Sequence, residues 1–386
     1  DMRAALVRPA EEVHRHDVPL RPSAVAMAWL GVGLPHEVLA VPGVALAPHD
    51  VLVAVEMSTI CGSDIHTVQG RRHAPTPLVL GHESVGRIIA IGDEGARAVD
   101  GGELHVGDRV VWSVTVSCGH CDRCLVGLTQ KCRTIAKYGH ARIEPRWELT
   151  GGFAGHVHLR AGTAIVRVPE ALPAAALAPV SCATATAWAG IARGAALRGR
   201  GRPDPFPTAA EDAAVLACER VLVLGAGLVG LTAAVIAADL GGQVRIADPD
   251  PARRAFAERF GLTALAPEDV AEEGADLVIE ASGHAVRAAL DAVDVGGAVV
   301  LLGSVFPADP VPLDAERIVR GLVAVAGVHN YTGAELHAAA AFMAGPGRAH
   351  PFADAVGAVH PLAAVDGALA EAGAPDAPLR VGLTPR

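Results

Sequence analysis

The amino-acid sequence predicts an α/β protein of two domains: a mixed β domain with short strands, and a domain built on a doubly wound parallel sheet. The chain has 386 residues, which is enough for two hydrophobic cores. In its first half, short apolar runs separated by glycine turns are typical of a barrel-like β domain. From Arg220 onward, strand-like and helix-like segments alternate, and this pattern favours a parallel sheet covered by helices.

The strands of the first half are predicted from alternation and β-rich composition. Residues 50–57 alternate apolar and polar side chains, as a half-buried strand does. Further strands are expected in residues 3–7, 84–92, 107–111 and 149–168. The Ala-rich residues 170–192 predict one helix that carries both Cys182 and Thr186, and the Gly-, Arg- and Pro-rich residues 193–207 predict a surface loop.

The second half is predicted to contain strands that are each followed by a helix. An apolar strand at residues 220–224 leads through a glycine turn into a helix at residues 231–240. The uncharged run from 221 to 238 is cut by these glycines, so it fits a protein core better than a membrane span. The other expected elements are strands at 243–247, 276–282, 298–304, 322–328 and 379–383, and helices at 284–293 and after 330.

Composition excludes several classes of function. The net charge is −10 and no basic run occurs, so nucleic acid and anionic membranes are unlikely partners. No charged segment followed by an apolar one opens the chain, so secretion is not expected. Seven cysteines, an odd number with tight spacing, indicate metal binding rather than disulfides, and the cytosol is the expected compartment.

A glycine-rich turn opens the alternating half. It reads Gly-Ala-Gly-Leu-Val-Gly from Gly225 to Gly230, and Asp248 ends the next strand. The glycines allow a pyrophosphate to approach the backbone, the helix N-terminus favours its charge, and the acid can bond both ribose hydroxyls. This context predicts a dinucleotide site, and because the carboxylate repels a 2′-phosphate, NAD is favoured over NADP. The alternative is a packing turn with a capping aspartate.

Four cysteines form a compact cluster in the first half, within a lobe of about residues 117–133. They can close tetrahedrally on one zinc ion at about 2.3 Å each. Since four protein ligands leave no open position, this zinc is expected to be structural. An iron–sulfur cluster could use similar ligands, but no other feature of the sequence indicates one. The cysteines are Cys118, Cys121, Cys124 and Cys132.

A second group of ligand types lies upstream. Residues 60–66 read Ile-Cys-Gly-Ser-Asp-Ile-His, and residues 81–83 read Gly-His-Glu. A catalytic zinc needs three ligands from Cys, His or carboxylate, and Cys61 and His82 are of the right types. Asp64 and Glu83 could orient them by accepting imidazole N–H bonds. Taken alone, the pair fits a buried thiol and a core histidine equally well.

The pattern Cys-Gly-Ser-Asp-x-His followed by Gly-His-Glu, together with the cysteine lobe and the glycine turn, resembles the zinc-containing medium-chain dehydrogenase family, the alcohol dehydrogenase group. The resemblance extends from Arg3 to Leu383. It implies a GroES-like catalytic domain at residues 1–185 and 329–386, with a Rossmann NAD-binding domain at 186–328. It also implies a small alcohol, aldehyde or ketone as substrate, and a homodimer or homotetramer.

The resemblance implies a catalytic zinc held by Cys61, His82 and Cys182. Six of the seven cysteines would then serve two zinc ions per chain, leaving Cys218 free. Such a zinc binds the alcohol oxygen and lowers its pKa. Other implied catalytic residues are Glu83 as a carboxylate that can approach the metal, Asp64 as the orienting partner of the imidazole, and Ser63 and His66 as the proton relay.

The resemblance also assigns residues to NAD. Thr186 matches a contact of the nicotinamide ring, Arg253 a contact of the adenosine ribose, and Arg380 a contact of the pyrophosphate. The remaining residues expected to bind the cofactor are Gly225, Gly227, Leu228, Val229, Gly230, Asp248, Ser282 and Gly303.

The substrate is less sharply defined. By resemblance, Trp112 and Val114 lie near the pocket wall, and Arg71 and Arg72 lie on the loop after the relay histidine. A cation such as Arg72 could hold an anionic group, although loop arginines are usually just solvated charges. Residues 112–118, 130–132 and 137–140 resemble dehydrogenases associated with phosphonate metabolism, which implies a phosphonate-bearing alcohol.

Three other interpretations stay open. A polyol or sugar-alcohol dehydrogenase of the same family would share all these motifs. A zinc-independent reductase of the superfamily would lack the Cys and His ligands, so their presence argues against it. A non-catalytic protein that binds NAD and zinc would keep the fold, and only turnover can distinguish it from an enzyme.

Overall fold

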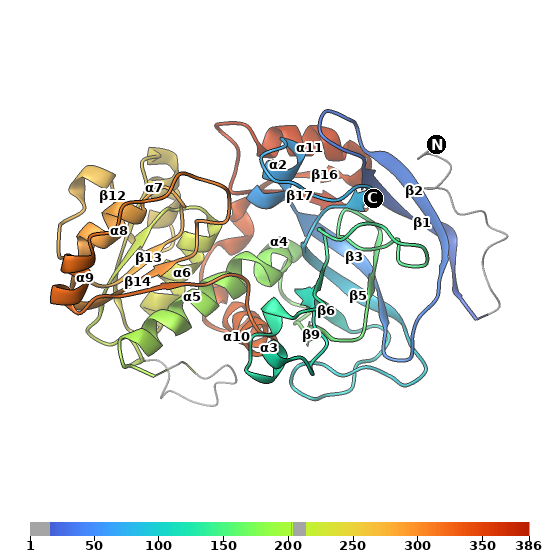
Figure 1. Ribbon diagram of the computed structural model, residues 1–386. Helices are drawn as coiled ribbons and strands as arrows, with labels where there is room; N and C mark the ends of the chain where they lie inside the picture. The colour runs from blue at the N-terminus through green and yellow to red at the C-terminus, as the bar shows by residue number, and fades with distance from the viewer. Residues whose placement is uncertain (1–15, 202, 204–213, 386) are drawn as a thin grey trace. The chain divides into compact units, whose positions relative to one another are not determined.

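The computed structural model describes residues 16–201, 203 and 214–385 (Figure 1). The strand predicted at residues 3–7 and part of the loop predicted at 193–207 lie outside these residues. The chain forms two compact units, the first made of Asp1–Cys182 with Ala353–Arg386 and the second of Ala183–Phe352. The predicted return to the first domain at residue 329 differs from this division, because helix α10 (Gly333–Ala344) packs against α5 (Ala183–Leu197) of the second unit.

The first unit contains two sheets of short strands. The smaller sheet has the order β2-β1-β4, and the larger follows β16-β17-β3-β5-β6-β7, with β8 paired to β3 and β9 paired to β6. Its strands are β1 Val18–Trp29, β2 Glu37–Val44, β3 Val51–Thr59, β4 Leu78–Val79, β5 Glu83–Ile91, β6 Arg109–Val116, β7 Ala136–Lys137, β8 His156–Leu159, β9 Thr163–Arg167, β16 Val356–Pro361 and β17 Arg380–Thr384. This arrangement confirms the predicted mixed β domain.

The helices of the first unit are short. They are α2 Gly62–Val68, α3 Asp122–Leu125, α4 Ala174–Leu177 and α11 Val365–Ala372, with 3-10 turns η2 Thr129–Lys131, η3 Ala178–Ser181, η7 Phe352–Ala355 and η8 Leu362–Ala364. The single helix predicted at residues 170–192 is therefore wrong. Its α-helical part is broken at Pro179 and Cys182, because a proline ring clashes with the preceding turn.

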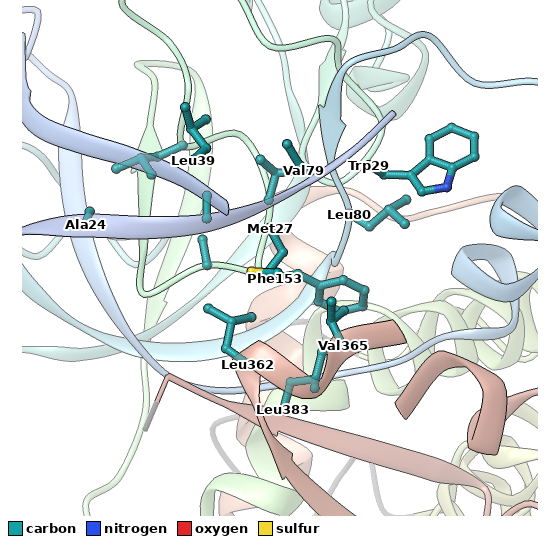
Figure 2. Packing of buried hydrophobic residues seen from close by; sticks show 14 of the residues in the cluster. Ala24, Met27, Trp29, Leu39, Val79, Leu80, Phe153, Leu362, Val365 and Leu383 are labelled. Carbon is teal, nitrogen blue, oxygen red and sulfur yellow. The ribbon is translucent and has the colours of Figure 1, made fainter. Parts of the chain in front are cut away.

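A hydrophobic core joins the two ends of the first unit. Met27 and Trp29 from β1 belong to one buried cluster with Phe153 from the β7–β8 connection, Val365 from α11 and Leu383 from β17 (Figure 2). All five side chains are almost fully buried. The C-terminal segment therefore completes the core that the N-terminal hairpin begins.

The second unit is built on a six-stranded parallel sheet. The strand order is β12-β11-β10-β13-β14-β15, so the chain starts in the middle and winds outward first to one edge and then to the other. The strands are β10 Arg220–Leu224, β11 Gln243–Ala247, β12 Thr263–Leu265, β13 Ala275–Glu280, β14 Val293–Leu301 and β15 Ala324–Gly327. This order is that of a doubly wound, Rossmann-type sheet and confirms the predicted class.

Helices connect these parallel strands. Besides α5 and α10 they are α6 Leu228–Asp239, α7 Pro251–Glu258, α8 Val286–Ala292 and α9 Ala315–Gly321, with 3-10 turns η5 Pro267–Asp269 and η6 Pro346–Ala349. Residues 193–197, predicted as loop, form the last turns of α5. Among the described residues no single helix is long and apolar enough to cross a bilayer; the pair Ala174–Ser181 and Ala183–Leu197 meets that test only when its members are combined.

Candidate active site and metal sites

One cluster of metal-ligating side chains joins three separate elements of the first unit. Cys61 caps the N-terminus of α2, His82 precedes β5, and Cys182 follows η3. The ligand atoms of these residues and of Glu83 lie within 4.8 Å of one another. The two thiol sulfurs are 3.8 Å apart, as expected for a zinc tetrahedron whose bonds of about 2.3 Å give edges of about 3.8 Å. The donor set therefore fits a zinc ion.

Two glycines bring the loops of this cluster together. Gly81 has φ +94°, and a Cβ at this position would lie 2.6 Å from the ring of Phe153. Gly139 has φ +74°, and its Cβ would lie 2.6 Å from the Gly81 carbonyl oxygen. Because only glycine tolerates both the positive φ and the contact, these positions fix His82 against the turn at residues 137–140.

Asp64 contacts two residues of this cluster, Cys61 and His82. Its carboxylate accepts the Cys61 N–H at 2.9 Å, and its other oxygen lies 3.6 Å from Nδ1 of His82. Burial opposes a charge on His82, yet the Asp64 and Cys61 side chains hold its pKa well above the usual value. With Nδ1 facing a carboxylate, Nε2 is the ring nitrogen that can bind a metal. This geometry supports the orienting role predicted for Asp64.

Glu83 is fully buried and engaged by two protein groups. Arg380 donates from Nε and Nη2 to its two oxygens at 2.8 and 2.9 Å, and the Thr59 hydroxyl donates at 2.5 Å. Burial raises the pKa of Glu83, and the Arg380 guanidinium opposes this shift. Arg380 lies on β17 of the first unit, where its guanidinium pairs with Glu83. That it also contacts the pyrophosphate of NAD stays a prediction.

The predicted relay residues lie one turn apart on α2. Ser63 Oγ is 3.4 Å from Nε2 of His82, so its hydroxyl lies beside the metal cluster. Thr67 donates its hydroxyl to the Ser63 carbonyl at 2.9 Å and helps to fix this turn. Ser63 and His66 are both half-buried, and their spacing places them on one face of the helix.

The four-cysteine lobe forms a second cluster. The sulfurs of Cys118, Cys121, Cys124 and Cys132 also lie within 4.8 Å of one another. Backbone N–H groups donate to two of them, from Cys118 to the Cys132 sulfur and from Cys121 to the Cys118 sulfur, each at 3.3 Å. The first of these bonds lowers the pKa of Cys132 to about 6, which favours the thiolate that a metal requires. Four thiols in this geometry fit the structural zinc predicted for the lobe.

The glycine turn of the second unit has the geometry of a phosphate cradle. Gly225 has φ +102°, and a Cβ on Gly230 would lie 1.8 Å from the Gly225 carbonyl oxygen. Gly227 caps α6, so the first N–H groups of this helix are presented at the turn. Buried Asp248 accepts the Ala226 and Asp250 N–H groups at 2.7 and 2.8 Å. The residues fit a dinucleotide.

The other residues predicted to bind the dinucleotide belong to this unit, apart from Arg380. Leu228 and Val229 form the first turn of α6. Ser282 follows β13 and lies against Gly225, while the Gly303 backbone packs on residues 281–283. Arg253 lies 4.0 Å from the Asp248 carboxylate, and Thr186 is half-buried on α5. The prediction that each of them contacts NAD stays a prediction.

Glu280 is a residue that the sequence analysis did not single out. It ends β13 and is fully buried. Its carboxylate accepts the N–H groups of Ser282 and Gly283 at 2.8 to 3.0 Å, and also the Ser282 hydroxyl. It therefore shapes the turn that lies against Gly225. The available signal was an acid directly after the apolar run Leu277 to Ile279 of this strand.

The candidate substrate residues are all at least half-buried. Trp112 is only 4% exposed and belongs, with Tyr138 and Trp147, to a buried cluster of the first unit; that it lines the substrate pocket stays a prediction. Val114 is also buried, and its carbonyl accepts the Tyr138 N–H at 2.9 Å. Arg72 is half-buried just after α2, where its N–H bonds to the His66 carbonyl.

Two further residues lie near the first cluster without having been predicted as site residues. The His140 ring centroid is 5.0 Å from that of His82. Burial, with the charges of His82 and Arg72, holds the pKa of His140 well below its usual value. Lys137 precedes it on β7 and is half-buried. A lysine gives no sequence signal of burial, so the half-buried position of Lys137 could be found only from the structure.

Comparison with known proteins identifies the family. The model of the alcohol dehydrogenase GroES-like domain matches residues 47–170, and that of the zinc-binding dehydrogenase matches residues 229–345. L-threonine 3-dehydrogenase of Pectobacterium carotovorum subsp. carotovorum is 32% identical over 302 residues, which cover 73% of this chain and 77% of the relative. The enzyme of the same name from Streptomyces coelicolor is 32% identical over 309 residues, which cover 75% and 79%.

Solved structures share the fold over nearly the whole chain. An alcohol dehydrogenase from Thermotoga maritima has a TM-score of 0.81 at 24% identity, covering 94% of this chain and 100% of that one. A cobalt- and zinc-bound thermostable alcohol dehydrogenase from Pyrobaculum aerophilum has a TM-score of 0.75 at 25% identity, with coverage of 94% and 100%. The chain belongs to the zinc-containing medium-chain dehydrogenase family, the alcohol dehydrogenase group. Its class is therefore that of a zinc-dependent dehydrogenase.

Proposed function

We propose that this protein transfers hydride reversibly between a primary or secondary alcohol and NAD, with Cys61, His82 and Cys182 holding the catalytic zinc. The observation that carries the proposal is the convergence of these three ligands within 4.8 Å, on elements far apart in the sequence. Zinc bound there supplies a Lewis acid toward the substrate oxygen. Expected assembly as a homodimer or homotetramer and a cytoplasmic location belong to the same proposal, on the strength of the family.

The side chains around the cluster suit proton transfer. Ser63 Oγ lies 3.4 Å from Nε2 of His82 and is placed to take the proton of a substrate hydroxyl. His66, one helical turn on, is the group that can receive it, since histidine changes charge near neutral pH. Asp64 orients the His82 ring, and the ion pair with Arg380 holds the Glu83 carboxylate beside the metal ligands.

The dinucleotide is proposed to be NAD. The buried Asp248 carboxylate lies at the end of β11, where a ribose is bound in folds of this type. A 2′-phosphate would meet that negative charge, so NADP should bind more weakly. Replacing Asp248 with Ser should narrow the ratio of KM values for NADP and NAD, and an unchanged ratio would contradict this assignment.

For the substrate we favour an alcohol that carries an anionic group such as a phosphonate. The cations Arg72 and Lys137 lie close to each other and act on His140, which contacts His82. The relatives at 32% identity are named for L-threonine, which carries an ammonium group in addition to its anionic carboxylate. The two carboxylates beside the cluster are already engaged, Asp64 with Cys61 and His82 and Glu83 with Arg380 and Thr59. An anion without an ammonium group suits these surroundings better.

The test is NADH formation by zinc-replete protein with a panel of simple alcohols, polyols, hydroxyalkylphosphonates and L-threonine. Each compound is assayed beside Cys61→Ser. We expect turnover that is lost in the variant, and the highest kcat/KM for a hydroxyalkylphosphonate. Best turnover of a polyol or of threonine would overturn the substrate assignment alone. If nothing turns over while NAD still binds, the enzyme proposal fails and a non-catalytic binding protein is left.

A single substitution tests the anion directly. Arg72→Ala should raise KM for an anionic alcohol far more than KM for a neutral one, because only the anion loses a charge-assisted bond. Equal effects on both substrates would show that Arg72 is a solvated loop charge.

A further inference from the structure

Lys137 and Arg72 are two cations whose charges both act on His140, the histidine whose ring lies 5.0 Å from that of His82. Lys137 ends β7, and Arg72 follows α2, so the two come from different elements of the first unit. The turn that carries Lys137 is firmly placed. Its carbonyl accepts the His140 and Ala141 N–H groups at 3.1 and 2.9 Å.

The close approach of the backbones at Gly139 and Gly81 sets this turn against the metal ligand. A Cβ on Gly139 would collide with the carbonyl oxygen of Gly81, the residue before His82. The His140 ring accordingly lies 5.0 Å from the His82 ring, centroid to centroid. His140 donates its Nδ1–H to the Tyr138 carbonyl at 2.9 Å, which leaves Nε2 as an acceptor. His140 therefore contacts the metal ligand with a ring that donates one hydrogen bond to the backbone and accepts at its other nitrogen.

The charge around Lys137 is not compensated within the described part of the chain. The charges that act on its ammonium are those of Lys131 and Arg72, both positive, and the charge of Lys137 in turn acts on His140. Burial, reinforced by these two cations, lowers the pKa of Lys137 to about 8. A half-buried ammonium beside another cation destabilises the folded protein, so a site of this kind is best explained by an anion that binds there.

We propose that Lys137, with Arg72, binds the anionic group of the substrate, a phosphonate or a carboxylate. The inference deepens the proposed function and rests on it for the word substrate, while the anion site itself can be tested without turnover. Lys137 is assigned here as a specificity residue: its ammonium bonds the anionic oxygens and thereby directs the substrate hydroxyl toward the metal side of His82.

The experiment measures anion binding to the zinc-loaded full-length protein by titration calorimetry, with ethylphosphonate and propionate as probes. Lys137→Met should weaken binding of the preferred probe at least about tenfold, because a charge-assisted hydrogen bond is lost. Lys137→Arg, which keeps the charge, should stay close to wild type. The matched control is Arg71→Met, since Arg71 is exposed and donates to Gln69 instead.

The pH dependence gives a second readout, which a merely structural lysine would not move. Binding requires the ammonium, so the affinity of the wild type for propionate should fall above about pH 8, whereas Lys137→Arg should show no such fall. Without any anion, Lys137→Met should melt at a higher temperature than wild type at neutral pH, because an uncompensated cation is removed.

The outcomes are distinguishable. Stronger binding of ethylphosphonate than of propionate would identify a phosphonate site, and the reverse a carboxylate site; either supports the inference. Failure of the wild type to bind both probes, or equal weakening by Lys137→Met and Arg71→Met, would overturn it. Turnover of neutral alcohols with no anion binding would defeat the inference and leave the proposed function intact. Anion binding without turnover of any alcohol would support the anion site and defeat the proposed function.

Discussion

The two metal clusters of the first unit are built in opposite ways. The sulfurs of the lobe come from one short loop, Cys118 to Cys132, whereas the other cluster brings together Cys61 and Cys182, which are 121 residues apart. Closing a short loop costs little chain entropy, so the lobe can assemble locally around its metal. The cluster of Cys61, His82, Glu83 and Cys182, here called the dispersed cluster, can form only after the sheets of the first unit have formed. The lobe therefore depends on the spacing of its cysteines in the sequence, whereas the dispersed cluster depends on the fold of the whole unit.

Their supports differ in the same sense. In the lobe, backbone N–H groups of Cys118 and Cys121 stabilise the sulfurs. In the dispersed cluster, buried charged side chains support the ligands instead. Asp64 contacts Cys61 and His82, and Glu83 forms an ion pair with Arg380. Single side-chain substitutions should therefore damage the dispersed cluster, while the lobe should respond only to loss of a cysteine.

The largest expected effect is on turnover when the dispersed cluster loses a ligand. Cys61→Ser and Cys182→Ser should each lower kcat/KM at least about 10³-fold, since a Lewis acid stabilises the transition state by several kcal/mol. The double variant should be no worse than either single one, because residues that hold one metal act as a unit. Steady-state kinetics with metal analysis checks this. Each variant should retain about one zinc per chain, and multiplicative losses would show that the two cysteines do not serve one site.

The next largest effect concerns the buried ion pair. Arg380→Met leaves the Glu83 carboxylate buried without its main partner, which should destabilise the first unit by about 3–5 kcal/mol. Urea unfolding followed through Trp29 and Trp147, both buried in this unit, measures the change. Adding Glu83→Gln to Arg380→Met should recover part of the loss. The control is Arg87→Met, whose partner Glu170 is exposed; an equal shift there would contradict the argument.

The sequence predicted local motifs better than sites that are assembled from distant segments. The lobe, the glycine turn and Asp248 were predicted because spacing and context suffice for a local motif. Cys182 was assigned as a zinc ligand only through the family, and the helix around it was predicted wrongly: Ala-rich residues favour helix, but Pro179 breaks it. That proline was an available signal.

Contacts between distant residues left no signal in the sequence. Glu83 and Arg380 are 297 positions apart, so no periodicity or spacing could pair them. The half-buried position of Lys137 left no signal either, since lysines are mostly exposed, and the turn after it lies against Gly81, a residue more than fifty positions away. Trp112 lies on β6, which is buried along nearly its whole length, so alternation gave no signal of which way its ring points.

A smaller effect is expected from the orienting carboxylate. Asp64→Asn keeps an oxygen that can accept the Cys61 N–H but removes the charge that faces His82, so zinc affinity of the dispersed cluster should fall about 10- to 100-fold. Competition with a zinc chelator measures this, read separately for the first and the second zinc released. Asp122→Asn, an exposed carboxylate on the lobe, is the control. If the second zinc were weakened as well, the two sites would not be independent.

The smallest effect is predicted on the lobe itself. Arg133 forms an exposed ion pair with Asp122 and lowers the pKa of that carboxyl group. A lowered pKa means that the pair can stabilise the folded lobe only above the ordinary Asp pKa of about 3.9, with loss of the effect as the pH falls further. Even at neutral pH, solvent screens the pair, so Arg133→Gln should leave the melting temperature and the rate of zinc release unchanged. A much faster release of the lobe zinc in this variant would mean that the lobe, like the dispersed cluster, depends on side-chain charges. The contrast between a site held by its own backbone and a site held by its fold would then fail.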